Sequence, residues 1–376
     1  MLQVKTVIIG AGIIGTSIAK SLIDNKDNNN DNNNDNDIDL AIFEQENFIG
    51  HHTSSRNSGV IHAGLYYEKD SLKHRLCIEG NHLWDQWTHE LNVPLNRCGK
   101  FIIASTEEEA IRFDNLFLKA KNNGTDVRLA TAKEIKELQE YVIVKKAFFS
   151  PNTAIIETST LLKSIADFLY KKNIALMLKN KVLKIVRLDI ESQRDKNHNN
   201  RFYVETERES FYCRNLINAA GCFAVDLRKQ LALIELEKMW VKGNYLATNQ
   251  QFYKKHLIYP VPPIDEKILG VHSTFDHAGI LRFGPDAEDT DEINYHVYDS
   301  IIEKMWPQIK IRFKNIDYKQ LHPDYCGIRP QIKFNQKKYN DFWIKNFDGY
   351  IELCGIESPG LTAAPAIANY IRKLIS

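Results

Sequence analysis

The sequence predicts an α/β protein in which a Rossmann-like nucleotide-binding domain is joined to a second, discontinuous domain built on a mixed or antiparallel sheet. Three observations predict this fold. A glycine-rich turn at Gly10–Gly15 joins an apolar run, Val4–Ile9, to a stretch with helical spacing of apolar residues. A second buried strand, Leu40–Phe43, ends at the acid Glu44. Short apolar runs alternate with Pro and Gly turns between Trp240 and Asp286, which is typical of an antiparallel sheet.

Length and composition limit the class of protein. The 376 residues exceed one ordinary core and suit two domains. We expect the first domain at residues 1–75, 146–230 and 325–376, and the second at 76–145 and 231–324. The net charge of +1 gives no sign of a nucleic-acid-binding surface. The six cysteines form no CxxC pair, so we expect no metal site.

Targeting signals are missing from the pattern. No signal peptide precedes Val4, and there is no Arg-rich extension typical of a transit peptide. No apolar run reaches the ~18 residues that a membrane-spanning helix needs. We therefore expect a cytoplasmic protein, with a peripheral contact to the inner face of a membrane left open.

Hydrophobic periodicity gives the remaining elements. It predicts helices at Ser71–Leu91, Thr106–Asn122, Thr158–Lys171 and Leu361–Leu374. It predicts strands at Val182–Val186, Phe202–Thr206, Leu216–Ala220 and Tyr350–Leu353, with a polar hairpin loop at Asp195–Asn200. The segment Asp24–Asp37 holds only Asn and Asp besides Lys26, so we expect a solvated loop there.

The first glycine turn has the spacing of a dinucleotide site. Gly10 permits the tight turn, Gly12 lets the backbone approach a pyrophosphate, and Gly15 lets the helix pack close to the strand. The amides at the helix N-terminus favour phosphate. Glu44 is placed to bind ribose hydroxyls, at more than the usual ~20 residues from the turn. The polar segment Asp24–Asp37 accounts for roughly the excess, because loop length costs little entropy.

The segment after Glu44 favours FAD over NAD. An NAD enzyme would continue with alternating strands and helices, whereas this chain enters the polar loop Gly50–Gly64, rich in hydroxyls, amides and small residues. Such a backbone suits a flavin and its ribityl phosphate. An ordinary polar loop is the alternative.

Several motifs resemble those of one family. The stretch Arg56–Tyr67, followed by Ser71-Leu72-Lys73, resembles the signature of L-2-hydroxyglutarate dehydrogenases and oxidases, which are FAD enzymes of the D-amino-acid-oxidase-like superfamily. Further matching motifs follow in the family's order: Lys242–Tyr245, Tyr259–Pro262, Leu269–His272, Gly284–Ala287, Gly327–Pro330 and Gly355–Thr362. The resemblance therefore covers nearly the whole chain.

The resemblance implies oxidation of L-2-hydroxyglutarate to 2-oxoglutarate, with hydride transfer to flavin N5. Electrons would then pass to a quinone-type carrier or to oxygen. The residues expected to contact FAD are Gly10, Gly12, Ile14, Gly15, Glu44, Gln45, Thr53, Ser54, Ser55, Asn57, Ser58, Gly59, Val182, Ala220, Gly221, Arg329, Gly355, Pro359, Gly360, Leu361 and Thr362.

Two residues are the first candidates for the chemistry. Arg329 offers a planar, bidentate partner for a substrate carboxylate, and it matches the superfamily's carboxylate-binding arginine. His62 is either the base that takes the hydroxyl proton or a histidine that only bonds the flavin or backbone.

The other candidates carry open alternatives. His272 is a second possible base. Tyr245 and Tyr259 either donate to a substrate carboxylate or pack in a sheet. Lys73 either binds the distal carboxylate or is a solvated helix lysine.

Other functions of the same superfamily stay open. A glycine or sarcosine oxidase and a glycerol-3-phosphate dehydrogenase would share the cofactor motifs. A scaffold that binds FAD without catalysis is the non-enzyme alternative, and reduction of the flavin by a substrate separates it from an enzyme.

Overall fold

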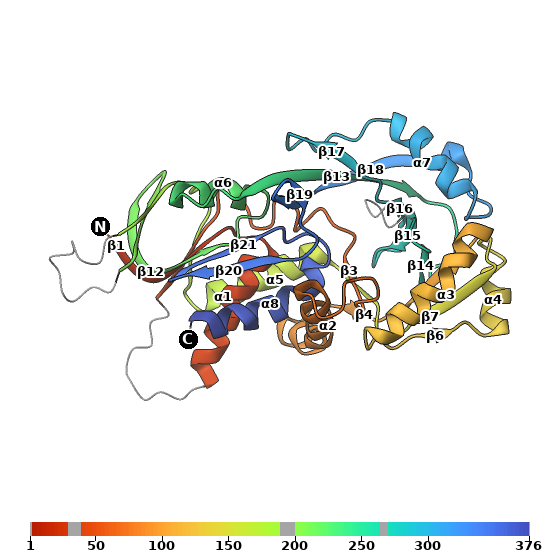
Figure 1. Cartoon of the computed structure of the whole chain (residues 1–376), viewed down its shortest axis with the longest axis horizontal. Helices are drawn as coiled ribbons and strands as arrows, with labels where there is room; N and C mark the ends of the chain where they lie inside the picture. The colour runs from red at the N-terminus through yellow and green to blue at the C-terminus, as the bar shows by residue number, and fades with distance from the viewer. Residues whose placement is uncertain (1, 29–38, 189–199, 264–269, 376) are drawn as a thin grey trace.

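A computed structural model describes residues 2–28, 39–188, 200–263 and 270–375, and it has two lobes (Figure 1). The first lobe has an eight-stranded sheet flanked by helices, and the second has a ten-stranded sheet. The predicted fold class, a Rossmann-like α/β domain with a second domain on a mixed sheet, is confirmed.

The first sheet is parallel at its centre. Its main order is β10-β11-β12-β1-β2-β9, with β21 beside the end of β12 and β20 beside β21. The strands are β1 (Leu2–Ile9), β2 (Leu40–Phe43), β9 (Ala175–Met177), β10 (Val182–Arg187), β11 (Phe202–Thr206), β12 (Ser210–Asn218), β20 (Trp343–Phe347) and β21 (Tyr350–Cys354). Both neighbours of β1 are parallel to it, so its carboxyl end meets the ends of β2 and β12 at one edge.

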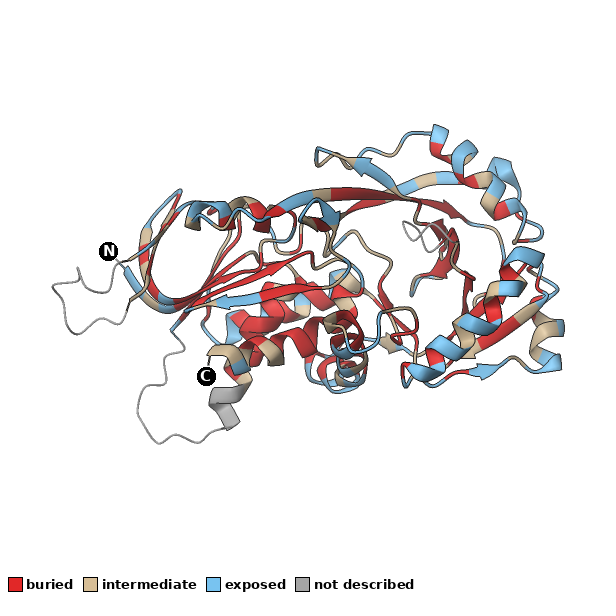
Figure 2. Ribbon diagram, viewed as in Figure 1, coloured by how far each residue is buried: buried red, intermediate tan, exposed pale blue. Residues whose placement is uncertain are grey.

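Apolar helices cover this sheet and share its core. They are α1 (Ile13–Asn28), α2 (Leu72–Leu91), α5 (Thr158–Lys171) and α8 (Gly360–Ile375), and the short α6 (Ala224–Arg228) follows β12. Most of α8 is buried, because small residues such as Ala363 and Ala364 let α1 and α2 approach it (Figure 2). The ends of the four helices predicted after residue 70 are confirmed within a residue, and Ser71 caps α2 by accepting from the amide of His74.

The second sheet is mostly antiparallel. Its order is β19-β18-β13-β16-β15-β14-β5-β7-β6, with β17 beside β13. The strands are β5 (Lys100–Ala104), β6 (Arg128–Leu129), β7 (Lys146–Ser150), β13 (Leu236–Thr248), β14 (Leu257–Pro260), β15 (His272–Phe275), β16 (Leu281–Gly284), β17 (Glu288–Thr290), β18 (His322–Phe334) and β19 (Lys337–Lys338). Helices α3 (Glu107–Asn122), α4 (Ala132–Leu138) and α7 (Ser300–Lys310) carry the more exposed faces of this lobe (Figure 2).

Two structures join the lobes. The long strands β13 and β18 pair over most of their length and run from one lobe into the other (Figure 1). A small sheet of β3 (Val60–Ile61), β8 (Ala154–Ile156) and β4 (Leu95–Asn96) lies between them. Helix α2 packs on α8, where Trp84 Nε1 donates to the carbonyl of Thr362 at 3.0 Å. We therefore propose that the first domain extends through α2, beyond residue 75.

The expected loop at Asp24–Asp37 is wrong at its start, because α1 continues to Asn28. Once the buried part of a helix has formed, each added residue costs little. Asp24 also forms an ion pair with Lys20 one turn earlier, with 2.7 Å between carboxylate and ammonium. Residues 29–37, the hairpin residues 195–199 and Leu269 lie outside the described residues.

Candidate active site

A cavity of about 560 Å³ lies where the two lobes meet. Its walls come from the turn between β1 and α1, the end of β2, the loop after residue 50, the start of β10, the turn after β12, and the turn before α8. The second sheet adds residues of β13, β14, β15 and β18. The predicted nucleotide motifs and the predicted chemical groups therefore line one continuous space.

Two glycines set the close contact of β1, β12 and α1. A Cβ on Gly10 would lie 2.6 Å from the carbonyl oxygen of Ala219 and one on Gly15 would lie 2.0 Å from that of Gly10, so neither position has room for a side chain. Gly10 also has φ +100°, which L side chains rarely adopt. The amide of Ile13 donates to Ser54 Oγ at 2.9 Å, and this bond fastens the polar loop over the helix N-terminus.

Glu44 lies at this same turn. Its carboxylate accepts from the amide of Ala11 at 2.8 Å and from that of Glu46 at 3.0 Å. The acid at the end of β2 is therefore held beside the glycine turn, where the sequence placed it.

The cavity wall also fits a nucleotide cofactor in a way that the sequence did not show. Asn180 is fully buried and lines the cavity beside Val182. Neither polar atom of its amide has a hydrogen-bond partner in the described part of the chain. A buried amide in that state calls for a ligand with donors and acceptors, which an adenosine offers. A lone Asn before a strand carries no motif, so sequence reasoning missed it.

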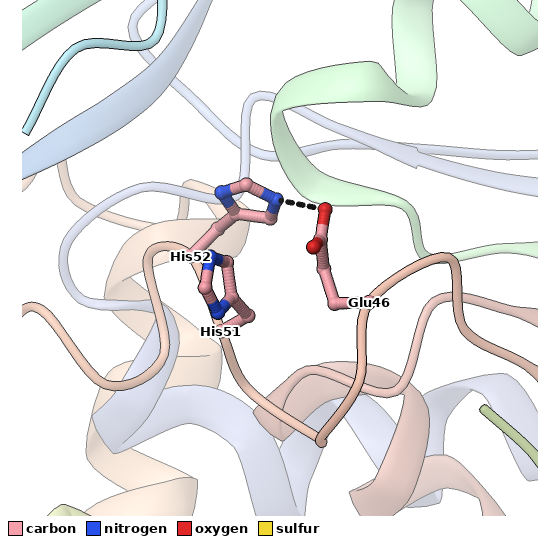
Figure 3. Close-up of side chains that lie close together, drawn as sticks. All are labelled: Glu46, His51 and His52. Carbon is pink, nitrogen blue, oxygen red and sulfur yellow. Dashed lines mark hydrogen bonds and ion pairs between the residues drawn. The ribbon is translucent and has the colours of Figure 1, made fainter. Parts of the chain in front are cut away.

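Glu46, His51 and His52 lie close together in the segment after β2 (Figure 3), and the two histidines line the cavity. His52 uses both ring nitrogens, since Nε2 is 3.1 Å from Glu46 Oε1 and Nδ1 is 2.8 Å from the hydroxyl of Tyr295. Burial lowers the pKa of His52 although Glu46 opposes this. The hydrogen bonds of His52 connect this loop to the segment after β17, whereas His51 Nδ1 is buried without a partner among the described residues.

His62 follows β3 and faces the first turn of α8. Its amide donates to Thr362 Oγ1 at 2.9 Å, and its Nε2 lies 3.5 Å from Ser358 Oγ. Burial, and then the nearby charge of Lys100, lower the pKa of His62 well below its ordinary value. The imidazole is therefore neutral at pH 7.

His272 and Tyr259 stack on each other in the cavity wall. Their ring centroids are 3.7 Å apart with planes 20° from parallel. His272 Nδ1 lies 3.0 Å from the carbonyl of Gly270, so the neutral ring carries its proton there and leaves a lone pair on Nε2. Burial lowers the pKa of His272 to about 3. Tyr259 is 1% exposed, and its hydroxyl has no hydrogen-bond partner among the described residues.

Arg329 on β18 presents a guanidinium to the cavity. Nη2 donates to the carbonyl of Asp286 at 3.2 Å, which fixes the plane of the group. Nη1 is buried and finds no partner within the described ranges. On the neighbouring strand, Tyr245 stacks on Tyr325 with 4.6 Å between centroids, and Tyr325 in turn donates to the carbonyl of Asn57 at 2.8 Å.

The five predicted catalytic residues, His62, Tyr245, Tyr259, His272 and Arg329, all line the cavity. So do most of the predicted cofactor residues: Gly10, Gly12, Ile14, Glu44, Gln45, Thr53, Ser54, Asn57, Ser58, Val182, Ala220, Gly221, Arg329, Pro359, Gly360, Leu361 and Thr362. Gly15, Ser55, Gly59 and Gly355 are not among the lining residues. Gly15 acts behind the wall, through its contact with Gly10.

The structure places two lysines in surroundings that the sequence did not predict. Lys73 is neither solvated nor free, because its ammonium pairs with Glu357 at 2.9 Å and both side chains are largely buried. Gln331 also donates to Glu357, at 2.7 Å. Lys100 was not singled out, yet it is fully buried at the start of β5. Its place in an apolar strand gave no motif, and its neighbours come from distant parts of the chain.

Comparison with known proteins agrees with this geometry. Residues 5–374 match the family model DAO, described as FAD dependent oxidoreductase. The chain belongs to this family of FAD-dependent oxidoreductases. The expected resemblance is also confirmed: the chain is 31% identical to the mitochondrial L-2-hydroxyglutarate dehydrogenase of Arabidopsis thaliana, over 98% of this chain and 83% of that protein. It is 26% identical to the glycerol 3-phosphate dehydrogenase of Caloramator mitchellensis, over 98% and 73%.

Solved structures share the fold of this oxidoreductase. The FAD-bound, dithionite-reduced L-alpha-glycerophosphate oxidase of Mycoplasma pneumoniae superposes with a TM-score of 0.86 at 22% identity, over 100% of this chain and 95% of that one. Glycine oxidase of Geobacillus kaustophilus gives 0.79 at 16%, also over 100% and 95%. FAD is thus the cofactor that the glycine turn, Glu44 and Asn180 would hold.

No described helix has the length and apolar character needed to cross a membrane.

Proposed function

We propose that this oxidoreductase converts L-2-hydroxyglutarate to 2-oxoglutarate. The observation that carries the proposal is the buried Nη1 of Arg329, which lacks a partner among the residues described and lies on the cavity wall with two neutral histidines. A fixed guanidinium without a carboxylate partner suits an acidic substrate. The relatives named L-2-hydroxyglutarate dehydrogenase support this choice of acid.

The reaction divides between cofactor and protein. Bound FAD supplies the acceptor for the hydride that leaves C2 of the substrate. Arg329 holds the carboxylate next to that carbon, with its plane fixed by the bond to Asp286. Orientation of this kind turns an encounter into an aligned pair and is worth several kcal/mol of the barrier.

His62 takes the proton of the substrate hydroxyl as the carbonyl forms. Its ring is neutral, it reaches the cavity, and Ser358 lies beside its Nε2. An anionic substrate raises the pKa of a nearby imidazole, which offsets the effect of burial and Lys100 and improves the base. His272 is the alternative base, but its Nδ1 is held by the carbonyl of Gly270 and its ring stacks on Tyr259.

The proposal is tested by an anaerobic screen of flavin bleaching. L-2-hydroxyglutarate should reduce the flavin, whereas D-2-hydroxyglutarate, glycine, sarcosine and glycerol 3-phosphate should not. Glycerol 3-phosphate oxidation is the second candidate, because one relative of similar coverage bears that name. Faster reduction by glycerol 3-phosphate or by an amino acid would make the substrate assignment wrong, and no reduction by any compound would favour the FAD-binding scaffold.

The electron acceptor is proposed to be a quinone-type carrier, reached from a cytoplasmic protein at the inner face of a membrane. Oxygen is the alternative acceptor. Reoxidation rates with oxygen, a dye and a quinone, measured with and without vesicles, separate the two. An enzyme reoxidised only by oxygen and unaffected by vesicles would exclude the carrier.

A further inference from the structure

Lys100 is a buried charge that the mechanism above does not use. Its side chain is 0% exposed, and its Nζ has no hydrogen-bond partner in the part of the chain that is described. The ammonium lies 4.4 Å from the ring centroid of Tyr259 and 5.3 Å from that of Tyr66. Such ring contacts offset only part of the cost of removing an ammonium from water, so an anion placed beside Nζ would be stabilised there.

Two hydroxyl groups beside Lys100 are also without partners. The hydroxyls of Tyr66 and Tyr259 are both shielded from solvent, and neither bonds to a described residue. The ammonium thus lies against two tyrosine rings, and it and both hydroxyls are buried donors with no acceptor among the described residues. The carboxylate of Glu357, which also lines the cavity, is already held by Lys73 and Gln331 and does not serve them.

Tyr259 connects these groups to the cavity. Tyr259 lines the cavity and stacks on His272, and the charge of Lys100 acts on both His62 and His272. Lys100 and Tyr66 are not themselves among the lining residues, so the ammonium, which lies over the ring of Tyr259, has to turn toward the cavity on its flexible four-carbon stem. Arg329 provides the other cation, from β18 rather than β5.

We propose that Lys100, with the hydroxyls of Tyr66 and Tyr259, forms a second anion subsite that receives the carboxylate remote from the reacting carbon, so that the cavity selects dicarboxylates over monocarboxylates. This inference rests on the proposed function for the identity of the reacting acid. The inference adds the residues that would bind the carboxylate at the far end of the substrate.

The subsite also predicts a pH dependence specific to dicarboxylates. Burial lowers the pKa of Lys100 to about 7. The titratable groups that face it are His62, Tyr66, Cys77, Cys98, Tyr259 and His272. The ammonium is present below pH 7 and is lost as the pH rises through that value. Dicarboxylate affinity should therefore fall above pH 7, and monocarboxylate affinity should show no such fall.

The test uses the FAD-loaded enzyme and two inert five-carbon acids, glutarate and pentanoate, with the flavin spectrum as the readout of binding. The parent should bind glutarate at least ~10-fold more tightly than pentanoate. Lys100→Met should remove most of that preference while pentanoate binding stays unchanged. Tyr66→Phe should remove part of it, and since the lost hydroxyl has no partner among the described residues, this variant should fold normally.

A matched control is Lys20→Met, which removes another buried ammonium, in α1 and away from the cavity. It should lower thermal stability, because it breaks ion pairs to Asp24 and Glu90, and leave the glutarate preference intact. Lys100→Met should not lower stability, because methionine is apolar and similar in size. Loss of the glutarate preference in Lys20→Met, or its survival in Lys100→Met, would overturn the subsite.

Turnover separates this proposal from the proposed function. If no 2-hydroxy acid reduces the flavin, the proposed function fails, and glutarate binding still decides the subsite. If L-2-hydroxyglutarate reduces the flavin and Lys100→Met raises its KM with little change in kcat, both stand. If Lys100→Met changes kcat alone, the lysine acts on the histidines and not on the distal carboxylate, and the subsite is wrong.

Discussion

The two ends of the cavity are built in different ways. The nucleotide end is formed mainly by backbone. Gly10 and Gly15 permit close contact between β1, β12 and α1, and the amides of Ala11 and Ile13 are bonded to Glu44 and Ser54. At the reacting end, side chains from the second sheet supply the donors, and several have no partner among the residues described. The first end, which we call the cradle, is the rigid backbone of the glycine turn Gly10–Gly15 together with Glu44. The second end is a set of side-chain donors whose missing acceptors the substrate would supply.

This difference predicts opposite effects of mutation, and the largest is expected at Gly15. A Cβ there would lie 2.0 Å from the backbone oxygen of Gly10, and neither the strand nor the turn can give way. Gly15→Ala should therefore yield protein with little or no flavin, measured as the ratio of flavin to protein absorbance. Ser17→Ala on the same helix removes a buried hydroxyl without a described partner and should retain full flavin. Flavin retained in Gly15→Ala would mean that the backbone of the glycine turn can shift to admit a side chain.

The next largest effect is expected at His62, in turnover and not in flavin content. His62→Asn removes the proposed base and should slow flavin reduction by roughly 10²–10⁴-fold. His272→Asn removes an imidazole from the same cavity and should cost less, because we assign the proton transfer to His62 and a packing role to His272, whose ring stacks on Tyr259. Rapid-mixing measurements on both variants compare them directly. A larger loss in His272→Asn would exchange the two assignments.

Arg329→Lys should have a smaller effect again. It keeps the charge but loses the planar fork, so kcat/KM should fall by roughly 1.5–3 kcal/mol in free-energy terms, mostly through substrate affinity. Flavin content should be unchanged. Arg282→Lys on β16 is the matched control, since Arg282 is another arginine of the second sheet but pairs with Asp276 and Asp324 and does not line the cavity. Equal turnover of Arg329→Lys and the parent would contradict the assignment of Arg329 as the residue that binds the substrate carboxylate.

The same contrast explains what could be predicted from sequence. The nucleotide end could be predicted because its glycine spacing and Glu44 can each be recognised within a short segment of sequence. The structure places these segments together. Lys100 could not be found in this way, since its significance depends on Tyr66 and Tyr259, which lie far from it in the chain. Lys73 was predicted as a candidate for the distal carboxylate, but only the structure shows that its ammonium already forms an ion pair with Glu357. Helix α1 outran its expected end for a local reason, the ion pair of Lys20 with Asp24.

The smallest effect is expected from the polar residues between α1 and β2. If the cradle depends on the glycine turn and on Glu44, then replacing residues 29–37 by a Gly/Ser sequence of equal length should leave flavin content and turnover within roughly twofold, because a chain of that composition buries no apolar surface. The ends of this segment are held independently. Asp24 pairs with Lys20, and the carbonyl of Asp39 accepts from the amide of Thr6 at 3.1 Å. Loss of flavin in this variant would show that the cradle needs side chains beyond the turn, and the contrast between the two ends would fail.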